Sequence, residues 1–162
     1  MVIPPPTRLV AILHSAPLGD GTRTLRRVET ARDFLGCEST TVANLYPATL
    51  PNTNAFPVLD DESIWEQGRA GILDALDLDD AAAVLLGYGV SPPTGRQRKN
   101  YLQQVKWVED ELATRDIPVW TFGGRPAHPS RWHRIVHRES PGETVESAIA
   151  NHLRQPAFQA RK

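Results

Sequence analysis

Continuous apolar runs constrain the fold of this chain more than any other feature of its sequence. The segments 8–14 (RLVAILH) and 81–88 (AAAVLLGY) contain continuous apolar runs, without the alternation of a half-exposed strand. Such runs are typical of parallel strands that are buried on both faces. Parallel strands must be joined by crossover connections, most often helices, so these two runs predict a sheet with helices between its strands.

The remaining segments fit this prediction. Two further strands are expected at 39–46, where β-branched residues are frequent and Pro47 should end the strand, and at 117–122. Apolar residues at three- to four-residue spacing predict four helices. The helices are expected at 22–35, from 60 to about 77, at about 96–115, and at 143–153. Thr22 should cap the first helix and Gly36 should end it.

This order of strands and helices predicts an α/β fold with three layers (α/β/α) and a four-stranded parallel sheet. A chain of 162 residues is long enough for one domain with a sizeable core. We expect a single domain at 1–155 and a flexible tail at 156–162.

Composition narrows the class of protein. The chain is 40% hydrophobic and 23% charged, as in soluble globular proteins, and lacks a membrane-length apolar run. Its first residues lack the pattern of a signal peptide, so a cytoplasmic location and no membrane partner are expected. The single cysteine, Cys37, excludes an internal disulfide and a four-cysteine zinc site.

Sequence motifs for bound cofactors are also missing. His133 and His137 have helical spacing, but no acidic or cysteine partner stands at a familiar metal-binding distance in the sequence. The chain contains neither a Gly-x-Gly-x-x-Gly motif after a strand nor a Walker phosphate loop. We therefore expect neither a metal nor another cofactor.

The net charge of −1 conceals local clusters of charge. Basic residues gather at 23–32, 96–99 and 125–138, so contact with an anionic partner should be local. Arg96, Arg98 and Lys99 stand at a predicted helix start, where the helix dipole disfavours cations, and a bound anion would compensate. A solvated helix face is the alternative interpretation.

Unusual residues follow the predicted strands. Because all strands of a parallel sheet point the same way, the loops after them should meet at one edge, where α/β folds bind ligands. The segment 120–133 is the richest of these loops in glycine, proline, arginine and histidine. The residues singled out at this edge are His14, Ser15, Pro17 and Asp20, then Asn44 and Tyr46, then 87–94 and 123–130.

Three of these residues also have structural interpretations. His128 could satisfy backbone groups of a turn, and Asn44 could hold its own loop. Asp20, which lies between two glycines, could be a turn or cap residue. The sequence leaves these alternatives open.

Four motifs resemble an uncharacterised bacterial and phage family of unknown function. Its members typically show Asn-Pro-Ser after the first strand, an Asp-x-Thr helix start, Val-x-Asn-Leu-x-Pro, and a late Gly-x-Pro-x-His-Pro. In this chain His14-Ser15-Ala16-Pro17 replaces the first motif. The matching segments are 9–17 (LVAILHSAP), 20–27 (DGTRTLRR), 42–47 (VANLYP) and 124–129 (GRPAHP).

The same order of signals is similar to the uracil-DNA glycosylase superfamily, which has a small parallel α/β domain, a base-reading asparagine and a His-Pro-Ser loop. By this resemblance Asn44 would read the base, and His128 would stabilise the charge on the base as the glycosidic bond breaks. Asp20 would orient water. The resemblance also implies ligand contacts of Tyr46 by stacking, and of Ser130 and the Gly124 backbone through phosphate.

These observations lead to one hypothesis and two alternatives. The hypothesis is a glycosylase-like domain that recognises a nucleobase, a nucleotide or nucleic acid and could hydrolyse an N-glycosidic bond. The first alternative is a non-catalytic nucleotide-binding protein or a phage or host-defence accessory protein. The second is a small-molecule hydrolase that uses Asp20 and His14.

Overall fold

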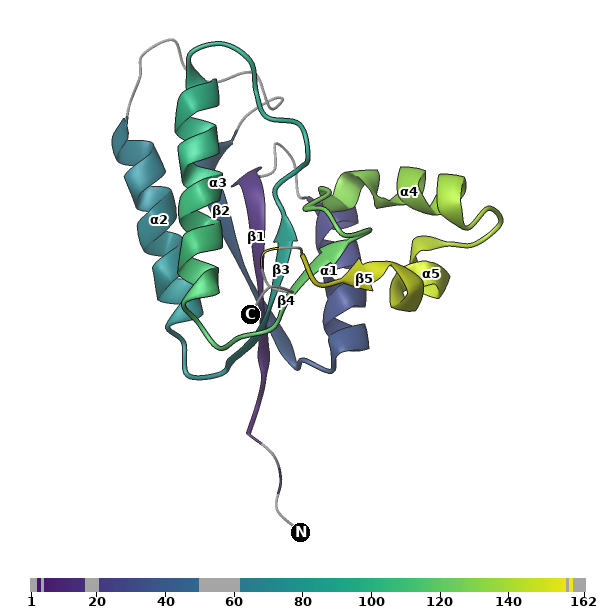
Figure 1. Ribbon diagram of the computed structural model, residues 1–162. Coiled ribbons are helices and arrows are strands. Elements are labelled where there is room, and N and C mark those ends of the chain that lie inside the picture. Colours follow the sequence, from purple (N-terminus) through teal and green to yellow (C-terminus); the bar gives the residue numbers. More distant parts are fainter. Residues whose placement is uncertain (1–2, 4, 17–20, 50–61, 157, 159–162) are drawn as a thin grey trace.

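A five-stranded sheet forms the middle layer of the protein (Figure 1). The computed structural model describes residues 3, 5–16, 21–49, 62–156 and 158. The strands lie in the order β2-β1-β3-β4-β5, and the first four are parallel. Their bounds are Arg8–Ala16 (β1), Ser39–Thr49 (β2), Ala81–Gly87 (β3), Val119–Phe122 (β4) and Leu153–Arg154 (β5).

Helices cover both faces of this sheet. In Figure 1, α2 and α3 lie on one face, and α1, α4 and α5 lie on the other, which confirms an α/β protein with helices on both sides of the sheet. The helices are α1 (Thr22–Leu35), α2 (Glu62–Leu76), α3 (Gln97–Ala113), α4 (Trp132–Glu139) and α5 (Val145–His152), with a 3-10 turn, η1 (Pro129–Arg131), before α4.

Strand β1 is buried on both sides, as its continuous apolar run predicts. Val10 and Ile12 pack into the core on the side of α2 and α3 and have no exposed surface. Leu9 and Ala11 point to the opposite side and pack into the core formed with α1, α4 and α5. The alternation of a strand therefore gives each layer of helices its own core.

The prediction of four strands is wrong by one strand. The apolar spacing that predicted a helix to residue 153 holds only to His152, and Leu153 has an extended backbone. Leu153 and Arg154 then pair antiparallel with β4, and Thr121 Oγ1 donates a hydrogen bond of 3.0 Å to the carbonyl of Arg154. Sequence periodicity gives no sign of so short a strand.

Pro47 does not end β2, which continues to Thr49. This strand is at the edge of the sheet, and its register with β1 shifts between the pairs Ser15–Tyr46 and Ala16–Thr49. Pro47 lies within this irregularity, one of the places where a strand tolerates proline.

The ends of α1 were predicted in part. Gly36 ends the helix in the left-handed conformation with φ of 74°, as expected. Thr22, however, is the first helical residue and not its cap, because the N-cap is Gly21 and no side chain caps the helix. Helix α4 was not predicted.

Parts of four predicted segments lie outside the described residues. These are residues 17–20 of the loop after β1, which include Pro17, residues 50–60 of the loop after β2, residues 60–61 of the helix predicted from 60, and residues 157 and 159–162 of the predicted tail. Pro156 is buried, and Phe158 packs against the core on the side of α2 and α3.

Gly68 allows α2 to pack closely on β2, and this contact can be tested. A Cβ atom at position 68 would lie 2.3 Å from the carbonyl oxygen of Leu45. We therefore expect Gly68→Ala to lower the free energy of unfolding in urea by about 1–3 kcal/mol.

Gly71 of the same helix provides the matched control, since a Cβ atom there would meet nothing within 4 Å. Gly71→Ala should leave stability unchanged or raise it by up to about 1 kcal/mol through its higher helix propensity. Equal effects of the two substitutions would contradict the proposed packing.

Candidate functional site

The carboxyl ends of the parallel strands border a cleft with a volume of about 760 Å³. Its walls include residues at the end of β1 and in the middle of β2, the segment after β3, and the segment from the end of β4 into α4. The start of α1 also contributes. The edge that the sequence singles out is therefore the edge at which the cleft lies.

His128 lines this cleft and is held by the residue two positions later. Its Nδ1 accepts a hydrogen bond from the backbone N–H of Ser130 at 3.2 Å and lies 2.8 Å from the Ser130 hydroxyl. Burial, and then the charge of Arg131, lowers the pKa of His128 to about 4. The ring is thus neutral at pH 7, and because Nδ1 is an acceptor, the proton is on Nε2.

His14, at the end of β1, is the second neutral histidine of the cleft. Its side chain is only 3% exposed, and its ring centroid lies 5.5 Å from that of Tyr101. Burial, followed by the proximity of His128, lowers the pKa of His14 to about 4. The two imidazoles therefore contribute polar groups to the cleft without charge at pH 7.

Asn44 lines the cleft from β2, close to the start of α1. Its Oδ1 atom is shielded from solvent and has no hydrogen-bond partner among the described residues. A buried polar atom left unpaired costs about 1–3 kcal/mol. A ligand that donates a hydrogen bond to this oxygen would recover much of that free energy.

Close packing positions the segment that carries His128. A Cβ atom at Gly87 would lie 3.1 Å from Pro129 Cδ, so only glycine lets Pro129 pack here without a shift of its neighbours. Trp132 stacks on Phe122 with a centroid distance of 4.4 Å and donates from Nε1 to the carbonyl of Ala127 at 2.9 Å. Both ends of the segment are thereby fixed to the sheet.

Helix α1 holds the same segment from the other side. The guanidinium of Arg27 donates a hydrogen bond to the carbonyl of Pro129 and lies 3.4 Å from His133 Nδ1. Burial, and then the proximity of Arg23, lowers the pKa of Arg27. A partly buried cation therefore links α1 to the 3-10 turn that follows His128.

The structure brings together five of the residues predicted for the site. His14, Ser15, Asn44, His128 and Ser130 all line the cleft, although they come from three separate segments of the chain. The cleft thus contains Asn44 and His128, to which the resemblance assigns base reading and charge stabilisation.

Other predicted residues lie elsewhere. Tyr46 is 3% exposed and packs edge-on against Trp65, with a centroid distance of 5.1 Å. Gly124 does not line the cleft, although its neighbours on both sides do. Arg96 and Arg98 are at the start of α3, where Arg98 borders a separate, shallow depression. Asp20 is outside the described residues.

Arginines are the main feature of the cleft that sequence reasoning missed. The sequence showed a basic cluster at 125–138 but did not assign its arginines a role in the site, whereas Arg125, Arg131, Arg134 and Arg138 all line the cleft. Arg134 follows Arg131 by three residues, and Arg138 follows Arg134 by four, so all three lie on one face of a helix. This spacing is informative only if a helix is predicted at 132–139.

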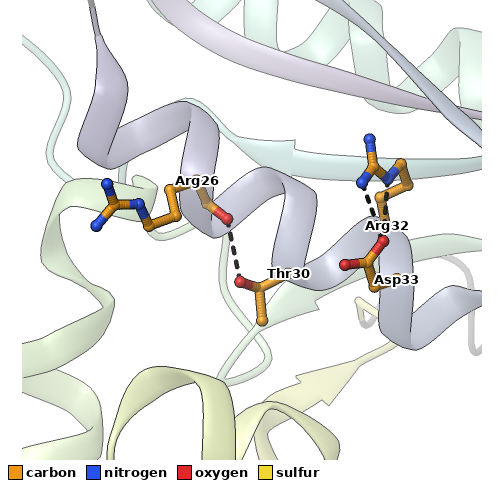
Figure 2. Close-up of polar contacts among 4 residues, drawn as sticks. All are labelled: Arg26, Thr30, Arg32 and Asp33. Atoms are coloured by element: carbon orange, nitrogen blue, oxygen red, sulfur yellow. Dashed lines mark hydrogen bonds and ion pairs between the residues drawn. The ribbon is translucent and has the colours of Figure 1, made fainter.

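Among the described residues, three of these arginines lack ion pairs of the kind that Arg8, Arg32 and Arg115 make. Arg32 on α1 lies against Asp33, with a distance of 3.0 Å between the guanidinium and the carboxylate (Figure 2). Within the described part of the chain, Arg125, Arg131 and Arg134 have no acidic partner, and Arg138 lies 3.9 Å from Glu139. The cleft therefore offers positive charge to an anion.

Neither a metal-binding cluster nor a membrane-spanning helix is found among the described residues. No three histidine, cysteine, aspartate or glutamate side chains in the described segments are grouped so as to hold a metal ion. None of the helices described has the length and apolar character needed to cross a membrane. Comparison of the chain with protein-family models, curated proteins and solved structures finds no match.

The role of Arg27 can be tested by hydrogen exchange. Arg27→Ala removes the hydrogen bond to the Pro129 carbonyl, so the segment after His128 should open more often. We expect the backbone amides of Ser130 and Arg131 to exchange roughly tenfold faster, measured by NMR at constant pH.

Arg26 is the matched control on the same helix. Its backbone carbonyl accepts a 3.0 Å hydrogen bond from the Thr30 hydroxyl, and this bond does not need the arginine side chain (Figure 2). Arg26→Ala should therefore leave the exchange of Ser130 and Arg131 unchanged. Unchanged exchange in Arg27→Ala would mean that Arg27 does not position the segment.

Proposed function

We propose that this cleft recognises the base of a nucleotide-type ligand through Asn44 and His128. The observation that carries the proposal is the buried, unpaired Oδ1 of Asn44 in the same cleft as a neutral His128. The asparagine oxygen is an acceptor and the His128 ring has a donor at Nε2. A nucleobase presents donors and acceptors side by side on its edges, which fits such a pair.

The arginines support a ligand that also carries phosphate. A planar guanidinium forms paired hydrogen bonds with phosphate oxygens and keeps its charge at any physiological pH. Arg131 directly follows the segment that holds His128 and lines the same cleft. Base and phosphate contacts can therefore be made by one ligand.

Hydrolysis of an N-glycosidic bond is the second candidate function. It is favoured by the tautomer of His128. The neutral imidazole has an N–H at Nε2, which can donate a hydrogen bond to the negative charge that develops on a departing base. The only carboxylate among the described residues of the cleft is Glu139, at the end of α4. Water activation would fall to Asp20 in this proposal.

Substitution of Asn44 and His128 tests both functions. Binding of nucleosides and nucleotides is measured by calorimetry, and release of free base is followed by chromatography. Asn44→Ala should weaken binding about five- to tenfold, since it removes one hydrogen bond to the base. Asn151→Ala is the control, because Asn151 is exposed on α5 and should not affect binding.

The results separate the candidates. Loss of base release in His128→Ala with retained binding would establish the hydrolase. Weaker binding by the two variants, with no base release by the wild type or either variant, would establish a binding protein. Binding that is equal in wild type and Asn44→Ala, or no binding of any nucleoside or nucleotide, would refute base recognition.

A further inference from the structure

Helix α4 presents a row of arginines along one wall of the cleft. Arg131 stands at its start, and Arg134 and Arg138 follow after three and four residues. All three line the cleft and are exposed. At 1.5 Å of rise per residue, the row extends about 10 Å along the helix axis, away from the segment that holds His128.

The charge of the cleft is larger than one phosphate group requires. Four arginines and one glutamate line it, which leaves three positive charges among its described residues. A phosphate monoester carries only about −1.5 to −2 charge at pH 7. Charge complementarity therefore favours a ligand with more than one phosphate.

We infer that the ligand is a nucleoside diphosphate or triphosphate whose linked phosphates lie along Arg131, Arg134 and Arg138 of α4. This inference rests on the proposed function, because the base would occupy the part of the cleft near Asn44 and His128. Arg125, on the segment before His128, adds a fourth cation to the same cleft.

Two observations favour a free nucleotide over a strand of nucleic acid. The cleft volume of about 760 Å³ lies within the range typical of sites for small molecules and cofactors, roughly 300–1,000 Å³. The whole chain has a net charge of −1, whereas binding to a long polyanion usually requires a positive excess over a wide surface. The positive charge of this cleft is local.

Calorimetry in EDTA with a nucleoside and its mono-, di- and triphosphate tests the inference. EDTA removes divalent ions, so direct pairing of arginine with phosphate is measured. Affinity should rise about five- to tenfold with each added phosphate up to the triphosphate. In the double variant Arg134→Gln/Arg138→Gln, the diphosphate and triphosphate should bind no more tightly than the monophosphate.

The double variant Arg26→Gln/Arg154→Gln is the control. It removes the same amount of charge from two exposed arginines, on α1 and β5, which do not line this cleft. It should bind the whole series as the wild type does. An equal loss of affinity in both double variants would show a general effect of net charge and overturn the inference.

Two further ligands complete the test. Inorganic tripolyphosphate should bind the wild type and lose affinity in Arg134→Gln/Arg138→Gln, and this result would support the phosphate site even if no nucleoside binds and base recognition fails. A single-stranded oligonucleotide that binds more tightly than the triphosphate would overturn the inference. Equal affinity for the nucleoside and its mono-, di- and triphosphate would also overturn the inference.

Discussion

The parallel pairing of β1 with β2 on one side and β3 on the other is the constraint on which the site depends. β1 has helices packed on both faces, and its interior residues have no access to solvent. Its direction fixes where His14 emerges, and the pairing places Asn44 opposite Leu13 in the register. Residues 30 positions apart in the chain thus become neighbours at one edge of the sheet.

The cleft has two kinds of surface, one lined by the neutral histidines His14 and His128 and one lined by the charged arginines of α4. Burial, together with the nearby His128 for His14 and Arg131 for His128, lowers the pKa of both histidines to about 4. Protonation of His128 would add charge beside Arg131, which has no acidic partner among the described residues. The cleft consequently combines neutral hydrogen-bonding groups at the strand ends with fixed positive charge on α4, as a ligand with a polar ring and an anionic group would need.

The sequence predicted the parts of the fold that depend on periodicity over long segments. The apolar runs of β1 and β3 and the spacing in α1, α2 and α3 predicted these elements within one to three residues at most ends. The two-residue β5 could not be predicted, because its pairing with β4 is decided by tertiary contacts. Pro47 was misleading for a related reason: its effect depends on whether the strand is central or at an edge.

The candidate site could be predicted where residues stand near the carboxyl end of a strand or in the segment that follows it, as with His14 and His128. Tyr46 shows the limit of that rule, since regular alternation along β2 would place it on the same face as Asn44. Asn44 lines the cleft, whereas Tyr46, two residues later and beside a shift of register, packs against Trp65 in the core with α2. The arginines of α4 could not be placed without knowing that this helix exists and how it lies over the strand ends.

The most direct test of the account is an NMR titration with a nucleoside triphosphate that follows the Asn44 side-chain amide and the ring nitrogens of His128. The account predicts an unprotonated Nδ1 and a protonated Nε2 in His128 at pH 7, and changes at both residues that fit one dissociation constant. Changes at the start of α3, with Asn44 and His128 unaffected, would contradict it.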